Sequence, residues 1–125
     1  MSNKHGTVLI VDDDAAVRSA LKFALEVEGF RVRLYAGSEA LLADLDLPGC
    51  GCLVVDYRMP VMDGLQLIDA LRGRNVAMPA ILITGRANDG LRRLAARSGV
   101  SQVLEKPLSD GALVASIRQA LGTCH

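Results

Sequence analysis

Aromatic residues are scarce in this chain of 125 residues, which contains two tyrosines, two phenylalanines and no tryptophan. Half of the residues are nevertheless hydrophobic, so a core must be built mainly from valine, leucine, isoleucine and alanine. That composition is typical of buried parallel strands covered by helices. The length is enough for one domain with its own core, and we expect a single domain over residues 1–125.

An excess of charge is also lacking, because 14 lysines and arginines balance 14 aspartates and glutamates. A neutral chain has no overall attraction to nucleic acid, so we expect no direct nucleic-acid partner. No apolar run is long enough to span a bilayer, and no signal-peptide pattern opens the chain. We therefore expect no membrane contact and a cytoplasmic location.

Cysteines are few, and their spacing fits no framework. The chain has three, an odd number, and Cys50 and Cys52 lack the second pair of ligands that a zinc site needs. We expect Cys52 to be a small buried residue at the start of a strand, with Cys50 in the turn before it.

Strand and helix patterns alternate five times along the chain. The expected strands cover residues 7–11, 31–35, 52–55, 80–83 and 101–104. Helices are expected over residues 15–28, 65–72 and 88–97, with another from Ser38 to the Pro48-Gly49 stop and a last one from Ser109 or Asp110. This alternation predicts an α/β fold in which a five-stranded parallel sheet carries helices on both faces.

Polar residues follow four of the apolar runs. Asp12 and Asp13 end the first, Asp56 ends the third, Thr84 ends the fourth and Lys106 follows the fifth. The carboxyl ends of parallel strands share one edge of a sheet, where ligand sites of α/β proteins form. In the flavodoxin-like doubly wound (βα)5 order 2-1-3-4-5, the first and third strands are neighbours, which brings the three aspartates together.

A cluster of three carboxylates needs a positive partner. Two carboxylates about 4 Å apart repel by about 4 kcal/mol at an effective dielectric near 20, and protons or a divalent cation must relieve this. Oxygen ligands of this kind suit Mg²⁺. We expect Asp13 to be a direct ligand, Asp12 a direct or water-mediated one, and Asp56 and the backbone carbonyl of Arg58 to complete the protein ligands.

The same residues fit phosphoryl transfer. Asp56 stands alone at the end of a central strand and is the best candidate for a nucleophile that takes a phosphoryl group. The Thr84 hydroxyl and the Lys106 ammonium would each hold a phosphoryl oxygen. Each residue alone has an ordinary explanation, such as helix capping for the Asp12–Asp14 run. Their joint position carries the hypothesis, and Asp14 is expected only to cap the following helix.

Segments 8–14, 53–64, 81–85 and 105–107 resemble the receiver domains of two-component response regulators. Thr84-Gly85 and Glu105-Lys106-Pro107 are most similar to the nitrogen-fixation type, usually joined to a LuxR-class DNA-binding domain. The resemblance implies that a sensor histidine kinase passes a phosphoryl group to Asp56 with Mg²⁺. It also implies a cis Lys106-Pro107 bond. On phosphorylation, the face of helix 4, strand 5 and helix 5 would either form a homodimer or dock an output.

One position departs from the family pattern. The family usually places a tyrosine or phenylalanine three residues before the lysine, and this ring turns inward when the threonine moves to the phosphate. Val103 occupies that position here. Valine has no ring to rotate and a stiff χ1 angle, so ordinary strand packing is its expected role.

Two helices carry surfaces whose use the sequence leaves open. Residues 15–28 present one apolar stripe with Val17 and Leu21 and a second with Phe23 and Val27, of which one must face the sheet. The other is either a kinase-docking surface or largely buried. The arginines of the helix over residues 88–97 are expected to form a solvated face or to pair with acids across a dimer.

Two alternatives to a phosphorylated switch are considered. A degenerate receiver would bind partners without phosphate, which Val103 favours and the complete set of acids opposes. An aspartate-nucleophile phosphatase of the haloacid-dehalogenase type would use Asp12 and Asp14 at the first strand, but the chain lacks a later acidic pair and room for a cap domain. Whether the chain is a stand-alone receiver or part of a longer regulator is left open.

Overall fold

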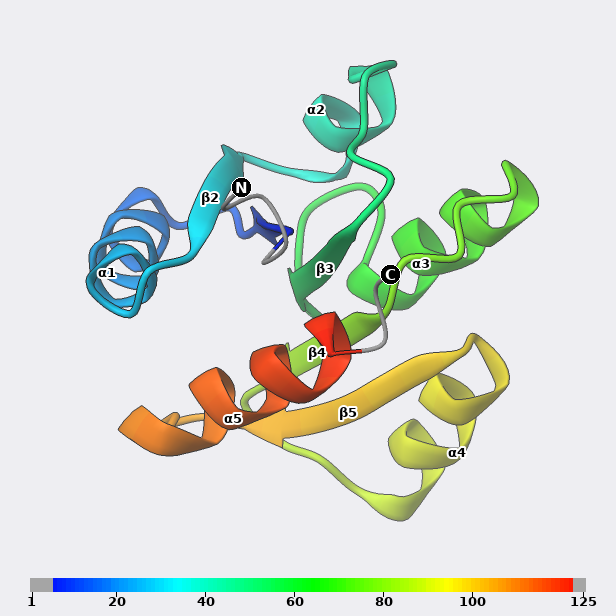
Figure 1. Cartoon of the computed structure of the whole chain (residues 1–125). Coiled ribbons are helices and arrows are strands. Elements are labelled where there is room, and N and C mark those ends of the chain that lie inside the picture. Colours follow the sequence, from blue (N-terminus) through cyan, green and yellow to red (C-terminus); the bar gives the residue numbers. More distant parts are fainter. Residues whose placement is uncertain (1–5, 123–125) are drawn as a thin grey trace.

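A computed structural model describes residues 6–122 and contains one sheet of five parallel strands (Figure 1). The strands are β1 (Thr7–Val11), β2 (Arg31–Tyr35), β3 (Gly51–Asp56), β4 (Ala80–Thr84) and β5 (Val100–Glu105). The helices are α1 (Ala15–Val27), α2 (Ser38–Ala43), α3 (Gly64–Gly73), α4 (Asp89–Arg97) and α5 (Asp110–Leu121). The strand order is β2-β1-β3-β4-β5, which confirms the predicted flavodoxin-like fold.

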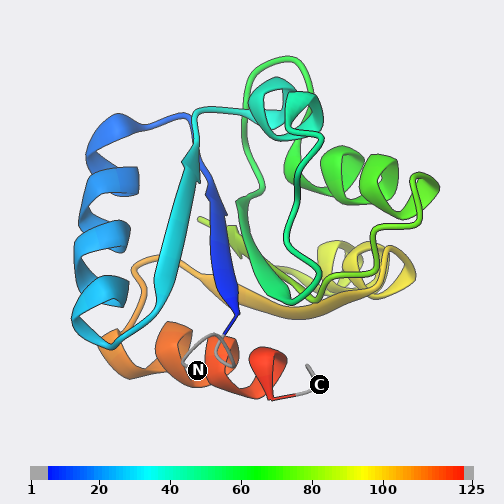
Figure 2. The same cartoon turned by 45° about the horizontal axis from the view of Figure 1, so that its top comes forward.

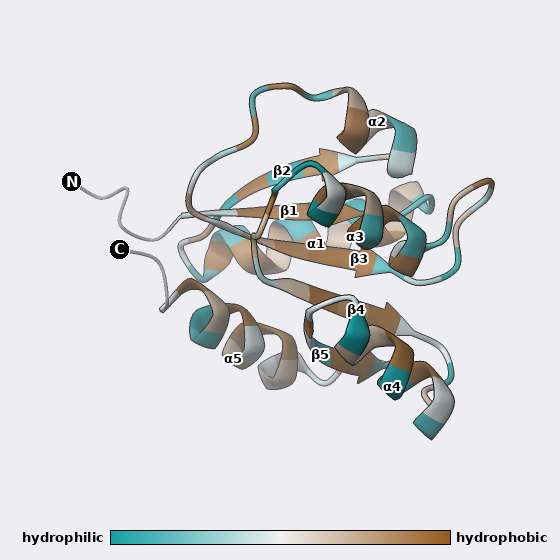
Figure 3. Cartoon of the chain, turned by 90° about the vertical axis from the view of Figure 1, so that its right-hand side faces the viewer, coloured by the Kyte–Doolittle hydropathy of each residue, from teal (hydrophilic) through white to brown (hydrophobic). Residues whose placement is uncertain are grey.

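Helices cover both faces of the sheet. Figure 2 shows α1 and α5 on one face and α2, α3 and α4 on the other. Each face of the sheet has its own hydrophobic core, and alternate residues of β1 point into one or the other. Leu9 and Val11 pack with α2–α4, whereas Val8 and Ile10 pack with α1 and α5. Strands β1, β3 and β4 are accordingly hydrophobic along their length (Figure 3). Each fully buried leucine or isoleucine stabilises the fold by about 2 kcal/mol.

Short polar side chains start three of the helices. The Asp14 carboxylate accepts hydrogen bonds from the backbone N–H groups of Ala16, at 2.9 Å, and Val17, at 3.3 Å. Asp63 and Gln66 form a reciprocal capping box at the start of α3. The Asn88 side chain accepts from the N–H of Leu91 at 2.8 Å. These bonds satisfy donors that the first turn of a helix leaves without partners.

The second helix is shorter than predicted. It ends at Ala43. The spacing of Leu41, Leu42 and Leu45 predicts one apolar face of this helix, but Leu45 lies outside it and is 91% exposed. The Asp44 carboxylate accepts a hydrogen bond of 2.6 Å from the Tyr35 hydroxyl and one of 2.9 Å from the Asp46 N–H. Because this carboxylate is held by Tyr35 of β2 and by the Asp46 N–H, the backbone leaves the helix after Ala43, five residues before Pro48.

Other boundaries differ by one or two residues. β3 begins at Gly51 and includes Asp56, and β5 runs from Val100 to Glu105. Cys52 is fully buried in β3, as expected, and burial raises the pKa of its thiol to about 12. Among the described residues, no helix is long and apolar enough to cross a membrane.

Replacing Tyr35 with phenylalanine is expected to lower the free energy of unfolding by about 1–2 kcal/mol. The variant keeps the buried ring but loses the donor to the Asp44 carboxylate, the bond that ends α2. Urea denaturation measures the loss. Tyr57→Phe is the matched control, because the Tyr57 hydroxyl has no hydrogen-bond partner among residues 6–122. Equal losses in the two variants would contradict the role given to the Tyr35 hydroxyl.

Candidate functional site

Three carboxylates meet at the carboxyl edge of the sheet. Val11 pairs with Val55 in the β1–β3 register, so Asp12 and Asp56 emerge side by side. Carboxylate oxygens of Asp12, Asp13 and Asp56 lie within 4.8 Å of one another. Asp12 and Asp56 are buried, whereas Asp13 is exposed. The donor set consists of carboxylate oxygens at a partly open edge, which fits a hard divalent cation that keeps some of its water.

Burial and mutual repulsion disfavour the charged forms of two of these groups. Burial raises the pKa of Asp56, the nearby charge of Asp12 raises it further, and Lys106 opposes both effects. Burial likewise raises the pKa of Asp12, against a 2.9 Å hydrogen bond from the Asp14 N–H and the charge of Lys106. A cation bound among the carboxylates would relieve this cost.

Lys106 forms an ion pair with Asp56. Its ammonium lies 3.3 Å from Oδ1 of Asp56, and its backbone N–H donates to the Thr84 carbonyl at 2.8 Å. The Lys106-Pro107 peptide bond is cis, as the resemblance implied. Because the lysine side chain is 41% exposed, solvent screens the ion pair.

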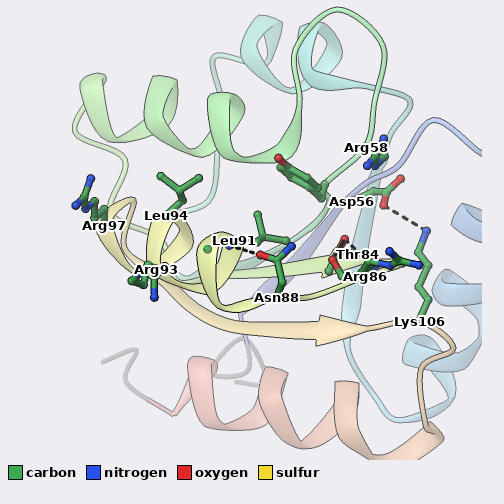
Figure 4. Close-up of a pocket in the computed structure, with 13 residues that line it drawn as sticks. Asp56, Arg58, Thr84, Arg86, Asn88, Leu91, Arg93, Leu94, Arg97 and Lys106 are labelled. Carbon is green, nitrogen blue, oxygen red and sulfur yellow. Dashed lines mark hydrogen bonds and ion pairs between the residues drawn. The ribbon is translucent and has the colours of Figure 1, made fainter.

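Thr84 lines one cavity together with Asp56 and Lys106, but its hydroxyl does not bond to either of them. Its hydroxyl donates to the Arg86 carbonyl at 3.2 Å and accepts from the Arg86 N–H at 3.3 Å. The side chain is therefore held by the β4–α4 loop and does not bond to Asp56. Figure 4 shows the arrangement, with the Asp56–Lys106 pair at one end of the cavity.

Comparison with known proteins settles the family. The model of the response regulator receiver domain matches residues 8–118. The chain belongs to this family. This receiver is 40% identical over 116 residues to the transcriptional regulatory protein FixJ of Azorhizobium caulinodans, covering 92% of the chain and 54% of that protein. It is 39% identical over 110 residues to the C4-dicarboxylate transport transcriptional regulatory protein DctR of Rhodobacter capsulatus, covering 86% of the chain and 56% of that protein.

Solved structures agree with this assignment. The receiver matches the crystal structure of FixJ-N with a TM-score of 0.85 and 35% identity, over 96% of each chain. It matches the response regulator StyR with a TM-score of 0.85 and 33% identity, over 94% of this chain and 59% of that one. The receiver spans about half the length of the curated relatives it matches. The resemblance to receivers of the nitrogen-fixation type is thereby confirmed.

Val103, at the position where an aromatic residue was expected from the resemblance, packs against the core. Val103 is half-buried and contacts the core beneath α2–α4. Arg58 lines the same cavity as Asp56, while the role of its backbone carbonyl as a metal ligand stays a prediction. The receiver thus lacks a ring at this position of β5.

The cavity contains residues that sequence reasoning did not assign to the site. It has a volume of about 860 Å³ and extends from the strand ends along α4. Its additional lining includes Tyr57, Asn88, Leu91, Leu94 and two arginines of α4, Arg93 and Arg97. Arg93 and Arg97 are four residues apart and therefore lie on one side of the helix. The spacing does not predict whether that side faces the cavity or another part of the surface, because this depends on how α4 packs against the sheet.

Proposed function

We propose that this receiver is a phosphorylation-dependent switch that takes a phosphoryl group from a sensor histidine kinase onto Asp56. The observation that carries the proposal is the cluster of Asp12, Asp13 and Asp56 within 4.8 Å, with the Lys106 ammonium on the Asp56 carboxylate. In the transfer, a carboxylate oxygen of Asp56 forms a bond to phosphorus as the phosphorus–nitrogen bond to the kinase histidine breaks. The released imidazole nitrogen keeps the electron pair.

Mg²⁺ is the cofactor that this donor set suits best. Asp12, Asp13, Asp56 and the backbone carbonyl of Arg58 would hold it. When bound, it neutralises charge on the carboxylates and on the phosphoryl oxygens. Burial of Asp12 and Asp56 keeps their oxygens in place, and charge neutralisation and positioning supply most of the catalysis in phosphoryl transfer.

Thr84 and Lys106 would read the phosphorylated state. Lys106 already contacts Asp56 and would hold one phosphoryl oxygen. The Thr84 hydroxyl would exchange the Arg86 carbonyl for another phosphoryl oxygen, which breaks the hydrogen bonds that now hold the β4–α4 loop. Because Val103 has no ring to turn, this loop is the proposed route by which the change reaches α4. The face of α4, β5 and α5 is the proposed homodimer surface of the phosphorylated form.

Incubation with Mg²⁺ and a small phosphodonor such as acetyl phosphate tests the proposal. Intact mass spectrometry is expected to show the mass of one phosphoryl group, absent in Asp56→Asn or when the metal is chelated. Continuous turnover of the donor that requires Asp12 and not Asp56 would favour the phosphatase alternative instead. Failure to gain the phosphoryl group in a folded protein would favour the degenerate receiver.

The exposed stripe of α1 is the proposed contact for the kinase. Phe23 is 73% and Val27 is 69% exposed, and a groove of about 520 Å³ separates them from Leu108 and Val114 at α5. The stripe with Val17 and Leu21 is half-buried against the rest of the fold. Exposed apolar patches of this kind are typical of protein contacts.

Phe23→Asp is expected to slow phosphotransfer from a histidine-kinase domain by about tenfold or more, because an apolar anchor at an interface carries much of the binding energy. Phosphorylation by acetyl phosphate should be unchanged, since Phe23 lies outside the cavity of Asp56. Rates with both donors are measured with a kinase that phosphorylates the parent protein. Leu45→Asp is the control, because Leu45 is 91% exposed and does not line the groove at α1. An equal effect of both substitutions on kinase transfer would contradict this surface.

A further inference from the structure

Positively charged side chains gather around the cavity beside Asp56, although the protein has no net charge. The formal net charge of the chain is zero. Among the cavity's lining residues, one carboxylate, that of Asp56, faces five cationic side chains, those of Arg58, Arg86, Arg93, Arg97 and Lys106. Asp12 and Asp13 lie beside Asp56 without lining the cavity, so the negative charge gathers at that end and the part along α4, with Arg93 and Arg97, attracts anions.

The four arginines of this cavity have no acidic partner in the part of the chain that the structure describes. Within residues 6–122, the ion pairs of the protein involve Lys22, Arg33, Lys106 and Arg118, and none includes a cavity arginine. Lys106 is occupied by Asp56. Guanidinium groups bind carboxylates through paired hydrogen bonds, so the four arginines present free donors to a ligand that carries several carboxylates.

The shape of the cavity selects an extended ligand with an apolar side. It follows α4, whose nine residues extend over roughly 13 Å at the rise of a helix. Leu91 and Leu94 of α4 both line it (Figure 4), but Leu91 is buried in the core, whereas Leu94 is 51% exposed. A single small anion would leave Leu94 uncovered. A nucleic acid would prefer exposed rings for stacking, and the one ring here, that of Tyr57, is half-buried.

We propose that the groove of Arg58, Arg86, Arg93, Arg97 and Leu94 binds an acidic polypeptide segment that carries apolar side chains. The carboxylates of the segment pair with the arginines, and its apolar side chains cover Leu94. This is a binding site of the unphosphorylated protein, distinct from the carboxylate cluster that accepts the phosphoryl group.

The position of Asp56 at one end of the groove couples the two sites, a step that rests on the function proposed above. A phosphoryl group on Asp56 adds negative charge beside the groove and competes with the segment for cations. It would also draw the Thr84 hydroxyl from the Arg86 backbone and so shift the loop that carries one of the arginines. Phosphorylation therefore weakens binding of the segment.

Fluorescence anisotropy with a labelled peptide tests the site. The probe is a glutamate-rich peptide with leucine at every third or fourth position, and its controls replace glutamate by glutamine or leucine by serine. The probe is expected to bind the unphosphorylated protein, and both control peptides to bind more weakly. The double variant Arg93→Gln, Arg97→Gln should weaken binding by about tenfold. Arg92→Gln, on the same helix but outside the cavity, should leave it unchanged.

Several results would overturn the site. Equal loss in the Arg92 variant would show a general charge effect, and equal binding of the serine peptide would show that the leucines do not contribute. Tighter, arginine-dependent binding of a single-stranded oligonucleotide would assign the groove to nucleic acid. Full competition by pyrophosphate at the probe's own concentration would assign it to a small anion.

Beryllofluoride with Mg²⁺ tests the coupling separately. It is expected to weaken peptide binding in the parent protein and to have no effect in Asp56→Asn. Unchanged binding in a protein that demonstrably takes up beryllofluoride overturns the coupling while the site stands. Failure of the protein to take up either beryllofluoride or a phosphoryl group contradicts the proposed function, whatever the peptide does.

Discussion

The Asp12→Asn variant is expected to be more stable than the parent in metal-free buffer and to accept phosphoryl groups on the order of a hundredfold more slowly. The substitution removes a buried carboxylate that repels Asp56. It keeps the side-chain oxygen that accepts from the Asp14 N–H. A gain of about 1 kcal/mol in the free energy of unfolding is the expected scale.

The pH dependence follows from the raised pKa of Asp12, of which burial is the main cause. The native state holds this proton at a higher pH than the unfolded chain does, so stability falls as the pH rises from near the ordinary value of 3.8 through the raised native value. Asparagine does not titrate. The advantage of the variant should therefore be absent at low pH and fully present at neutral pH.

Chemical denaturation at several pH values, with the metal chelated, measures this effect. Asp14→Asn is the matched control, because Asp14 is exposed and asparagine caps a helix as well as aspartate does. Little change is expected in that variant. Lower stability of Asp12→Asn at neutral pH would show that the carboxylate is stabilising without metal, and would contradict the repulsion on which the Mg²⁺ site is argued.

The Gly64→Ala variant is expected to lose about 3 kcal/mol of stability. A Cβ atom at Gly64 would lie 2.7 Å from the backbone oxygen of Asp56 and 2.9 Å from a side-chain carbon of Leu82. The contact with the backbone oxygen cannot be relieved without moving α3 or the end of β3. Because β3 ends at Asp56, the proposed phosphoryl acceptor, the surviving folded protein should also be phosphorylated more slowly.

Gly73→Ala in the same helix provides the control. Nothing lies within 4 Å of a Cβ atom at Gly73, so alanine should stabilise the protein by about 0.5–1 kcal/mol through its helix propensity. Thermal unfolding of both variants, with phosphorylation rates by acetyl phosphate, makes the comparison. If the two substitutions changed stability alike, the close approach of α3 to Asp56 would not constrain the site.

The fold was predictable because its determinants are local. Runs such as Val8–Val11, the cap of Asp14 and the stop at Gly29 define elements from neighbouring residues. The end of α2 was not predictable, because it depends on a hydrogen bond between Asp44 and Tyr35 of another element. Leu45 therefore seemed to continue an apolar stripe that the helix does not reach.

Part of the site was also predictable from the sequence, and part was not. Asp12, Asp13 and Asp56 meet because neighbouring parallel strands end at one edge, which strand order alone predicts. The conformation of Thr84 could not be predicted, because it depends on hydrogen bonds to the Arg86 backbone. The same holds for the groove along α4, since the spacing of its arginines and leucines does not say which cavity they line.

Identifying the residue that carries the phosphoryl group tests the central claim most directly. After incubation with Mg²⁺ and acetyl phosphate, borohydride reduces an aspartyl phosphate to the alcohol of homoserine, and peptide mass spectrometry locates it. We expect homoserine at position 56 alone, and none when the metal is chelated. Homoserine at position 12 instead, or none at all in protein that has gained the phosphoryl mass, would contradict the assignment of Asp56.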